Sequence, residues 1–264
     1  MADKTKQKKC RATPLFILAI LLVGVLLARP AYYLFEDWSF YWSDRTEAEQ
    51  LVKAHCEKMG ISYGQYPQSL IELLERNPET KDFVLNYPFR EKADYDLSEF
   101  ELGDSIPLFL QWDPRWGYEI YGSDCIGITG CGPTCLAMAG YFLTGSEEFT
   151  PDKIADFALR NDYYAKGYGS SWTLISEGSE KLGLKATELP LDRGRMVNAV
   201  TEGNPVILAM GAGDFTTSGH YIVLTGWNGN SFRVNDPNSI KNSQKLWTYE
   251  ELESQIRNIW KIEK

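Results

Sequence analysis

The amino-acid sequence predicts an α+β fold, with helices first and an antiparallel sheet later in the chain. Two observations lead to this class. Apolar residues recur at helical spacing in the first half, most clearly over residues 67–76. In the second half, short apolar runs at 205–210, 219–227 and 231–236 are typical of strands, and Asn228-Gly229-Asn230 is a strong hairpin turn between the last two.

The segment 1–30 has the pattern of a membrane anchor. A basic stretch precedes an uncharged run from Ala12 to Ala28, whose length is at the lower limit for a spanning helix. More cations precede the run than follow it, so we expect a cytoplasmic amino terminus and a single pass through the cell membrane. A cleaved signal peptide, giving a secreted protein, is the alternative. Both alternatives place the rest of the chain outside the cytoplasm.

A linker and a small helical region are expected over residues 31–104. The periodicity predicts a helix over 46–59, a second helix over 67–76 and one or two further helical turns over 79–86. The acidic segment 91–104 is expected at the surface.

The remaining residues, 105–264, are expected to form the main domain. The sequence predicts a strand at 107–111 and then a loop rich in Trp and Gly that runs to residue 130. After this loop we expect four helices, three strands and a last helix, in the following order: helices at 133–143, from Pro151, at 171–182 and at 192–202, strands at 205–210, 219–227 and 231–236, and a helix near 248–258.

Composition excludes some functions. The chain has 264 residues and a net charge of −9, and because residues 1–29 are themselves basic, the rest is more acidic still. Such a surface argues against a nucleic-acid partner and is compatible with an extracellular domain. Five cysteines are too few for a disulfide scaffold of this size, although a single bridge, such as Cys125–Cys135 or one with Cys56, remains open.

Cys131 lies in Gly130-Cys131-Gly132-Pro133-Thr134, at the expected start of a helix. Free backbone N–H groups and the positive end of the helix dipole would face its sulfur there. Such a site lowers the pKa of a thiol and favours the nucleophilic thiolate. The sequence therefore predicts a cysteine nucleophile.

His220 is one of only two histidines, and it begins an apolar run that is followed, after the hairpin turn, by Asp236. We expect Asp236 to accept a hydrogen bond from His220, whose other ring nitrogen faces the Cys131 sulfur. This set can attack a carbonyl carbon, form a thioester and release it with water. The backbone N–H of Cys131 and the side-chain amide of Gln111 are the candidate donors to the oxyanion.

The length of the hairpin turn decides whether the histidine and the carboxylate meet. If Asn228-Gly229-Asn230 forms the whole turn, Trp227 pairs with Ser231 and Ile222 pairs with Asp236. The carboxylate then lies on the face of the histidine, diagonally across the strand pair. A two-residue turn would move it to the opposite face. We expect the three-residue turn.

Four segments, at 111–117, 130–134, 219–224 and 235–239, resemble the peptidase family thirty-nine-like domain of bacterial surface proteins. This family is papain-like and is related to the proteases that trim bacteriocin leaders at a double glycine. The resemblance covers about residues 105–260. It implies a papain-like fold, with Cys131, His220 and Asp236 as catalytic residues and Gln111 at the oxyanion hole. Gln111 precedes the cysteine by a longer stretch of sequence than the glutamine does in the bacteriocin proteases. The transporter domains that accompany those proteases are also absent from this sequence, so the resemblance does not imply that the chain processes leader peptides.

The expected function is that of an extracytoplasmic, membrane-anchored cysteine hydrolase that needs no cofactor. Its partners would be a peptide, a protein or a cell-wall peptide as substrate, and the membrane through the amino-terminal helix. An inactive peptidase-like binding module, and a cell-wall amidase or acyl transferase, are the alternatives. A packed, inert Cys131 and a zinc site formed by Cys125, Cys131, Cys135 and His220 are the competing interpretations of the site.

Overall fold

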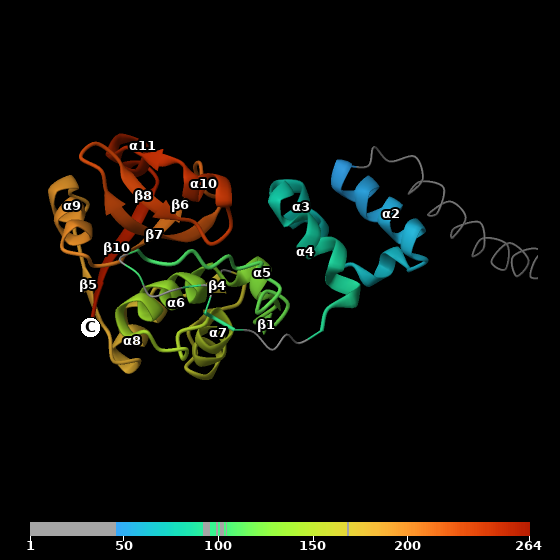
Figure 1. Ribbon diagram of the computed structural model, residues 1–264, viewed down its shortest axis with the longest axis horizontal. Coiled ribbons are helices and arrows are strands. Elements are labelled where there is room, and N and C mark those ends of the chain that lie inside the picture. The colour runs from blue at the N-terminus through green and yellow to red at the C-terminus, as the bar shows by residue number, and fades with distance from the viewer. Residues whose placement is uncertain (1–45, 92–95, 99, 101–102, 104, 168) are drawn as a thin grey trace, which may run out of the picture. The chain divides into compact units, whose positions relative to one another are not determined.

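The structure, a computed structural model, describes residues 46–91, 96–98, 100, 103, 105–167 and 169–264 (Figure 1). The expected membrane anchor at 1–30 and the linker up to residue 45 lie outside the described residues. Within the described part of the chain, no helix has both the length and the apolar character needed to span a bilayer. Residues 47–264 form one compact unit, and the boundary expected at 104/105 stays a prediction.

The predicted helical region is present. It comprises three α-helices and three short 3-10 turns: α2 (Glu47–Met59), η1 (Tyr63–Gln65), α3 (Gln68–Arg76), η2 (Pro78–Thr80), α4 (Lys81–Asn86) and η3 (Tyr87–Phe89). Gly60 ends α2 in the left-handed conformation, with φ of 67°, which an L side chain rarely adopts. The apolar faces of these helices form a core cluster with Val52, Leu70, Ile71 and Val84 among its members, and Cys125 from the later part of the chain belongs to the same cluster.

The main domain contains one six-stranded sheet, in the order β5-β10-β6-β7-β8-β9, in which every neighbouring pair is antiparallel. Its strands are β5 (Lys185–Glu188), β6 (Val206–Gly211), β7 (Gly219–Trp227), β8 (Phe232–Asn235), β9 (Leu246–Trp247) and β10 (Ile256–Glu263). Two small hairpins lie outside this sheet: β1 (Ile120–Tyr121) with β2 (Asp124–Cys125), and β3 (Tyr164–Ala165) with β4 (Gly169–Ser170). The predicted antiparallel sheet is confirmed, and β7 has the predicted bounds.

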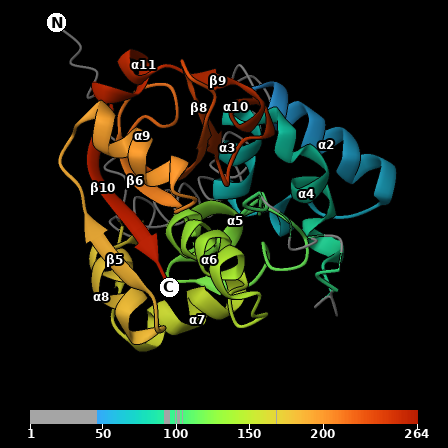
Figure 2. The ribbon, with the colours of Figure 1, turned by 60° about the vertical axis from the view of Figure 1, so that its left-hand side comes forward.

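Helices cover both faces of the sheet. They are α5 (Ile126–Thr129), α6 (Cys131–Thr144), α7 (Pro151–Arg160), α8 (Thr173–Lys181), α9 (Arg193–Thr201), α10 (Ile240–Gln244) and α11 (Tyr249–Glu253). Ile207 and Val223 belong to the core shared with α6, α7 and α8, whereas Leu208 and Ile222 belong to the core shared with α9 and α11. Because successive strand residues point to opposite faces, one strand serves both cores. Figure 2 shows α6, α7 and α8 gathered together, with α9 apart from them.

The expected strand at 107–111 is wrong. These residues belong to no strand of the described chain. The side-chain amide of Asn235 donates to the carbonyl oxygens of Ile106 and Pro107, at 3.1 and 3.0 Å. The N–H of Gln111 donates to the carbonyl of Pro237 at 2.7 Å. These contacts thus take the place of the regular backbone hydrogen bonds between two strands. Pro107 has no N–H and could not donate such a bond.

The expected last helix near 248–258 is right in its first part, where α11 lies, and wrong in its second part. Helix α11 ends at Glu253, and β10 begins at Ile256 and pairs with both β5 and β6. The spacing of Ile256, Ile259 and Trp260 would also fit one face of a helix. They are all buried in a strand that has helices on both faces, where apolar residues do not simply alternate with polar ones.

The hairpin between β7 and β8 differs from the predicted one at its turn. Trp227 pairs with Phe232, so the turn has four residues, 228–231, and not three. A β-bulge between Leu224 and Gly226 then adds one residue to β7. Val223 consequently pairs with Asn235, which is the pairing that the three-residue turn predicted at the site end of the strands.

Candidate active site

Cys131 is the first residue of α6, slightly before the helix start that the sequence predicts. Gly130 precedes it as the N-cap, and Pro133 lies in the first turn. A Cβ on Gly132 would come within 2.5 Å of Ser170 Oγ. The glycine therefore allows the start of α6 to pack directly against β4, and this contact fixes the position of the thiol.

His220 and Asp236 form a buried pair. His220 Nε2 lies 2.7 Å from Asp236 Oδ1, and the two residues are 8% and 1% exposed. His220 is the second residue of β7, and Asp236 follows directly after β8. The bulged hairpin thus brings the two predicted residues together. Because Asp236 holds Nε2, the other ring nitrogen, Nδ1, is left for Cys131.

Burial, Asp236 and Cys131 together set the protonation of His220. Burial alone would lower the pKa of the imidazole, because it disfavours the charged form. The charge and the hydrogen bond of Asp236, with a smaller effect from Cys131, outweigh burial and raise the pKa of His220 from 6.5 to about 10. His220 therefore carries its proton at neutral pH.

Asp236 is held by further hydrogen bonds besides the one to His220. Its Oδ1 accepts the backbone N–H of Asn238 at 2.9 Å, and its Oδ2 accepts the side-chain amide of Asn242 at 2.8 Å. Its own N–H donates to Ser243 Oγ at 2.9 Å. The sequence analysis missed Asn242 and Ser243. The only local signal was a polar run after Asp236, which by itself predicts no more than a turn.

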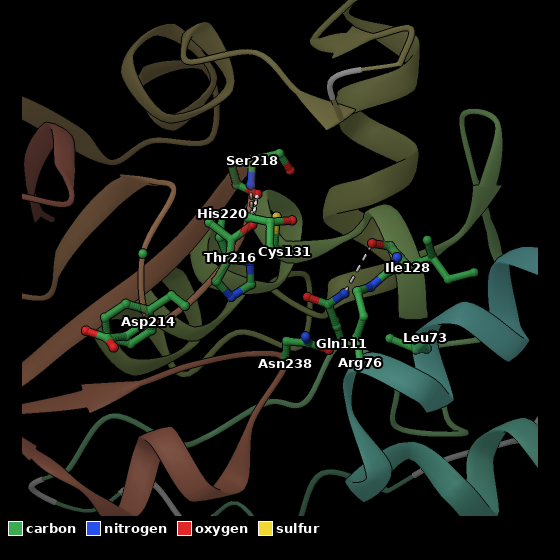
Figure 3. A pocket seen from close by; sticks show the side chains of 14 residues that line it. Leu73, Arg76, Gln111, Ile128, Cys131, Asp214, Thr216, Ser218, His220 and Asn238 are labelled. Carbon is green, nitrogen blue, oxygen red and sulfur yellow. Dashed lines mark hydrogen bonds between the residues drawn. The ribbon is translucent and has the colours of Figure 1, made fainter. Parts of the chain in front are cut away.

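Gln111 lines a cavity together with Cys131, and its predicted role as an oxyanion donor stays a prediction. Its side chain is buried, and its Nε2 donates to the carbonyl of Gly127 at 2.9 Å and to that of Ile128 at 3.4 Å. Figure 3 shows the second of these bonds. Its Oε1 is buried without a hydrogen-bond partner among the described residues. An amide nitrogen carries two hydrogens, and both donors of Nε2 are used by these two carbonyls.

Cys131 and His220 lie between two cavities. The larger, of about 490 Å³, is also lined by Leu73 and Arg76 of α3, by Gln111 and by the loop at 213–219 (Figure 3). The smaller, of about 400 Å³, is also lined by Ser170, Trp172 and Arg257. Trp172 is 50% exposed, so it presents an aromatic face to a ligand. An extended chain laid across both cavities would pass the thiol at its middle.

The competing interpretations of the cysteines find no support in the described residues. The described thiols, Cys56, Cys125, Cys131 and Cys135, are all free, so neither bridge that the sequence left open is formed. Within the same residues, no group of three or more His, Cys, Asp or Glu side chains is arranged to hold a metal ion. Cys131 is partly exposed to the cavities and not enclosed by the core.

The second histidine lies far from this chemistry. His55 packs its ring edge to face against Phe89, with 6.4 Å between the ring centroids. It belongs to α2, and its Nε2 is buried without a partner among the described residues. His55 therefore has a packing role.

Comparisons with known proteins give a family for the chain but no curated relative, since no curated protein matches it. The solved peptidase domain of Streptococcus ComA, a bi-functional ABC transporter involved in a quorum-sensing pathway, is 19% identical; the match covers 60% of this chain and 96% of that chain, with a TM-score of 0.43. A C39-like peptidase from Bacillus anthracis is 16% identical, and the match covers 62% of this chain and 97% of that chain, with a TM-score of 0.38.

The sequence model of the Peptidase_C39 like family matches residues 104–264, which is more than half of the chain. The match includes the segments at 111–117, 130–134, 219–224 and 235–239 that carried the resemblance, and it confirms that resemblance. The chain therefore belongs to the Peptidase_C39 like family of cysteine peptidases.

Proposed function

We propose that the chain is an extracytoplasmic cysteine hydrolase that cleaves a peptide or amide bond with Cys131, His220 and Asp236. One observation carries the proposal: the buried His220–Asp236 pair lies beside the thiol that opens α6, at the place where two cavities meet. The family assignment supports a peptide or protein substrate, because the matched domain is of the peptidase type.

The reaction follows from the charge of His220. The nucleophile is the thiolate form of Cys131, paired with the imidazolium of His220. The sulfur attacks the carbonyl carbon of the substrate, and the electron pair of the C=O bond moves to the oxygen. When the tetrahedral intermediate collapses, the C–N bond breaks and His220 gives its proton to the leaving amine. Water then attacks the thioester, His220 takes up a proton, and release of the acid restores the thiolate and the imidazolium.

The developing oxyanion needs hydrogen-bond donors. The N–H of Cys131 is one, because a helix start leaves its first N–H groups without intrahelical acceptors. The side-chain amide of Gln111 is the other candidate, once its Nε2 turns from the carbonyls of Gly127 and Ile128 that it binds here.

Location is the second part of the proposal. The basic stretch and the uncharged run from Ala12 to Ala28 support a single-pass anchor with a cytoplasmic amino terminus and an outer catalytic domain. A secreted form is the alternative. Protease added to intact cells should remove the domain and leave a membrane-bound amino-terminal fragment. Amino-terminal sequencing that begins after residue 28 would instead support signal cleavage.

The activity is tested with a peptide library and the purified protein, with Cys131→Ala as the matched control. Cleavage by the wild type, together with a thioester adduct trapped by mass spectrometry, is the expected result. Addition of free amines distinguishes hydrolysis from acyl transfer, because a transferase gives amide products. Equal retention of peptides by wild type and Cys131→Ala, with no turnover by either, would replace the hydrolase with a binding module.

A further inference from the structure

Glu79 connects the helical region to the segment that follows Asp236. Its Oε2 accepts the N–H of Ile240 at 3.0 Å, and its Oε1 accepts the N–H of Lys241 at 2.9 Å. These are the first two residues of α10, and the side chain of its N-cap, Ser239, accepts the N–H of Asn242. The carboxylate therefore satisfies two donors that the helix start leaves open, through charge-assisted bonds that are stronger than neutral ones.

Asn77 makes a second connection from the same turn. It is the N-cap of η2, and its Oδ1 accepts the N–H of Glu79 at 3.1 Å. Its amide nitrogen donates to the carbonyl of Asn238, which also accepts the indole N–H of Trp112 at 3.0 Å. Asn77 is 9% exposed, so these bonds are shielded from water.

Both connections end next to the residues that hold Asp236. Asn77 fixes the carbonyl of Asn238, and the N–H of the same Asn238 donates to Asp236 Oδ1. Glu79 fixes Lys241, and its neighbour Asn242 donates to Asp236 Oδ2. Each oxygen of the orienting carboxylate is thus bound by a residue that the helical region holds directly or through its immediate neighbour.

We propose, building on the proposed function, that Glu79 is a positioning residue for the active site: it holds the start of α10 so that Asn242 keeps Asp236 directed at His220. The helical region then completes the catalytic site and is not a separate spacer before the peptidase domain. Leu73 and Arg76 of the preceding helix α3 line the larger cavity with Cys131, so the same segment also reaches the substrate side of the site.

Glu79 acts through geometry in this proposal. The groups that shift the protonation of His220 are Asp236 and Cys131, and Glu79 is not among them. Removal of Glu79 therefore affects His220 only if Asp236 moves. This gives a readout that a purely structural role would not change, namely the titration of His220 in the folded protein.

The test is an NMR titration of the histidine ring protons in the full chain. There are only two histidines, and a His55→Gln variant assigns the remaining signal to His220. We expect Glu79→Ala to lower the pKa of His220 from about 10 toward 6.5, by an amount that the titration resolves. It should also lower kcat by about 10²-fold, since a small misplacement of a catalytic group has an effect of that size, with little change in KM.

Glu75→Gln is the matched control, because Glu75 is an exposed carboxylate of the same segment; it should leave the titration unchanged. Glu79→Gln keeps the size of the side chain and one acceptor, so it should lower the pKa of His220 by less than Glu79→Ala does. If Glu79→Ala does not fold, the titration of Glu79→Gln is the test. An unchanged His220 titration in a folded Glu79 variant overturns the proposal.

The two proposals fail in different ways. If the wild type cleaves no peptide, the hydrolase proposal fails, and the titration still reports whether Glu79 positions Asp236. If Cys131→Ala abolishes cleavage while Glu79→Ala leaves both kcat and the titration intact, the hydrolase proposal stands and the positioning role is overturned.

Discussion

Cys131 and Cys135 lie one turn apart in α6, but only Cys131 lines the two cavities. Cys135 is fully buried, and burial raises the pKa of its thiol well above the ordinary value, with further contributions from Cys131 and Asp236. Burial also raises the pKa of Cys125, to about 12. Because the thiolate is the reactive form, these raised pKa values keep Cys125 and Cys135 protonated and unreactive at neutral pH.

Iodoacetamide at neutral pH should therefore alkylate Cys131 before any other described cysteine. Peptide mass spectrometry gives the rate at each site, and Cys135→Ala is the control that should leave the rate at Cys131 unchanged. His220→Ala should slow the reaction, because the imidazolium that stabilises the thiolate is lost. Equal and slow labelling of all thiols would contradict the assignment of Cys131 as nucleophile.

Asp236→Asn should lower the pKa of His220 toward 6.5, because the amide removes the negative charge that outweighs burial. The amide can also stabilise the wrong tautomer of the ring, so kcat should fall by about 10²–10⁴-fold. The pKa is measured by NMR and kcat on a cleaved peptide. Asp214→Asn is the control: Asp214 lines the same cavity and is bound to Gln255 Nε2 at 2.7 Å. A His220 titration that Asp236→Asn does not change would contradict the pairing.

The same shift predicts how stability depends on pH. The pKa of His220 is raised on folding, from 6.5 to about 10, so the folded state binds the proton more tightly than the unfolded state. This contribution, on the order of a few kcal/mol, is fully present below pH 6.5 and is lost as the pH rises toward 10. The difference in free energy of unfolding between wild type and Asp236→Asn, measured with urea, should therefore shrink over that interval.

Sequence reasoning was most successful where local chemistry determines the structure. The apolar run at 219–227 and the Asn-Gly turn predicted the hairpin, and the pattern around Cys131 predicted a cysteine at a helix start; the structure has both. The three-residue turn was wrong, but the bulge after Leu224 returned the strands to the predicted register at Asn235. A bulge depends on the packing of both faces and leaves little trace in the sequence.

Other features could not be predicted because they depend on distant partners. The two bonds of Glu79 join residues 161 and 162 positions apart, and nothing near Glu79 indicates them. Residues 256–260 have helical spacing and form a strand only because β5 and β6 are there to pair with them. In that segment, pairing with the neighbouring strands outweighs the helical pattern of the local sequence.

Gln111→Ala should lower kcat by about 10²-fold, the usual effect of removing one oxyanion donor. It should leave the rate of Cys131 alkylation nearly unchanged, because alkylation develops no oxyanion. Ser218→Ala is the control, since Ser218 is exposed and lines both cavities. If Gln111→Ala slows alkylation and cleavage to the same extent, Gln111 supports the position of the nucleophile and is not an oxyanion donor.

Arg76 should make the enzyme prefer an acidic substrate residue on the side of α3. Arg76 lines the larger cavity, and its guanidinium lies 3.8 Å from the carboxylate of the exposed Glu72. An acidic side chain laid in that cavity would gain a partner, whereas a basic one would be repelled. Because Arg76 is largely exposed, solvent weakens the effect, and we expect a ratio of kcat/KM of about three- to tenfold between matched Glu and Lys peptides.

Arg76→Glu should reverse this preference, and raising the salt concentration should reduce it in the wild type. Glu72→Gln is the matched control, since it removes the neighbouring charge and leaves the arginine; it should keep or strengthen the preference for the Glu peptide. The peptides differ at one position only, so a difference in kcat/KM reports that contact. If Arg76→Glu discriminates between the two peptides as the wild type does, α3 borders the cavity without contacting the substrate there.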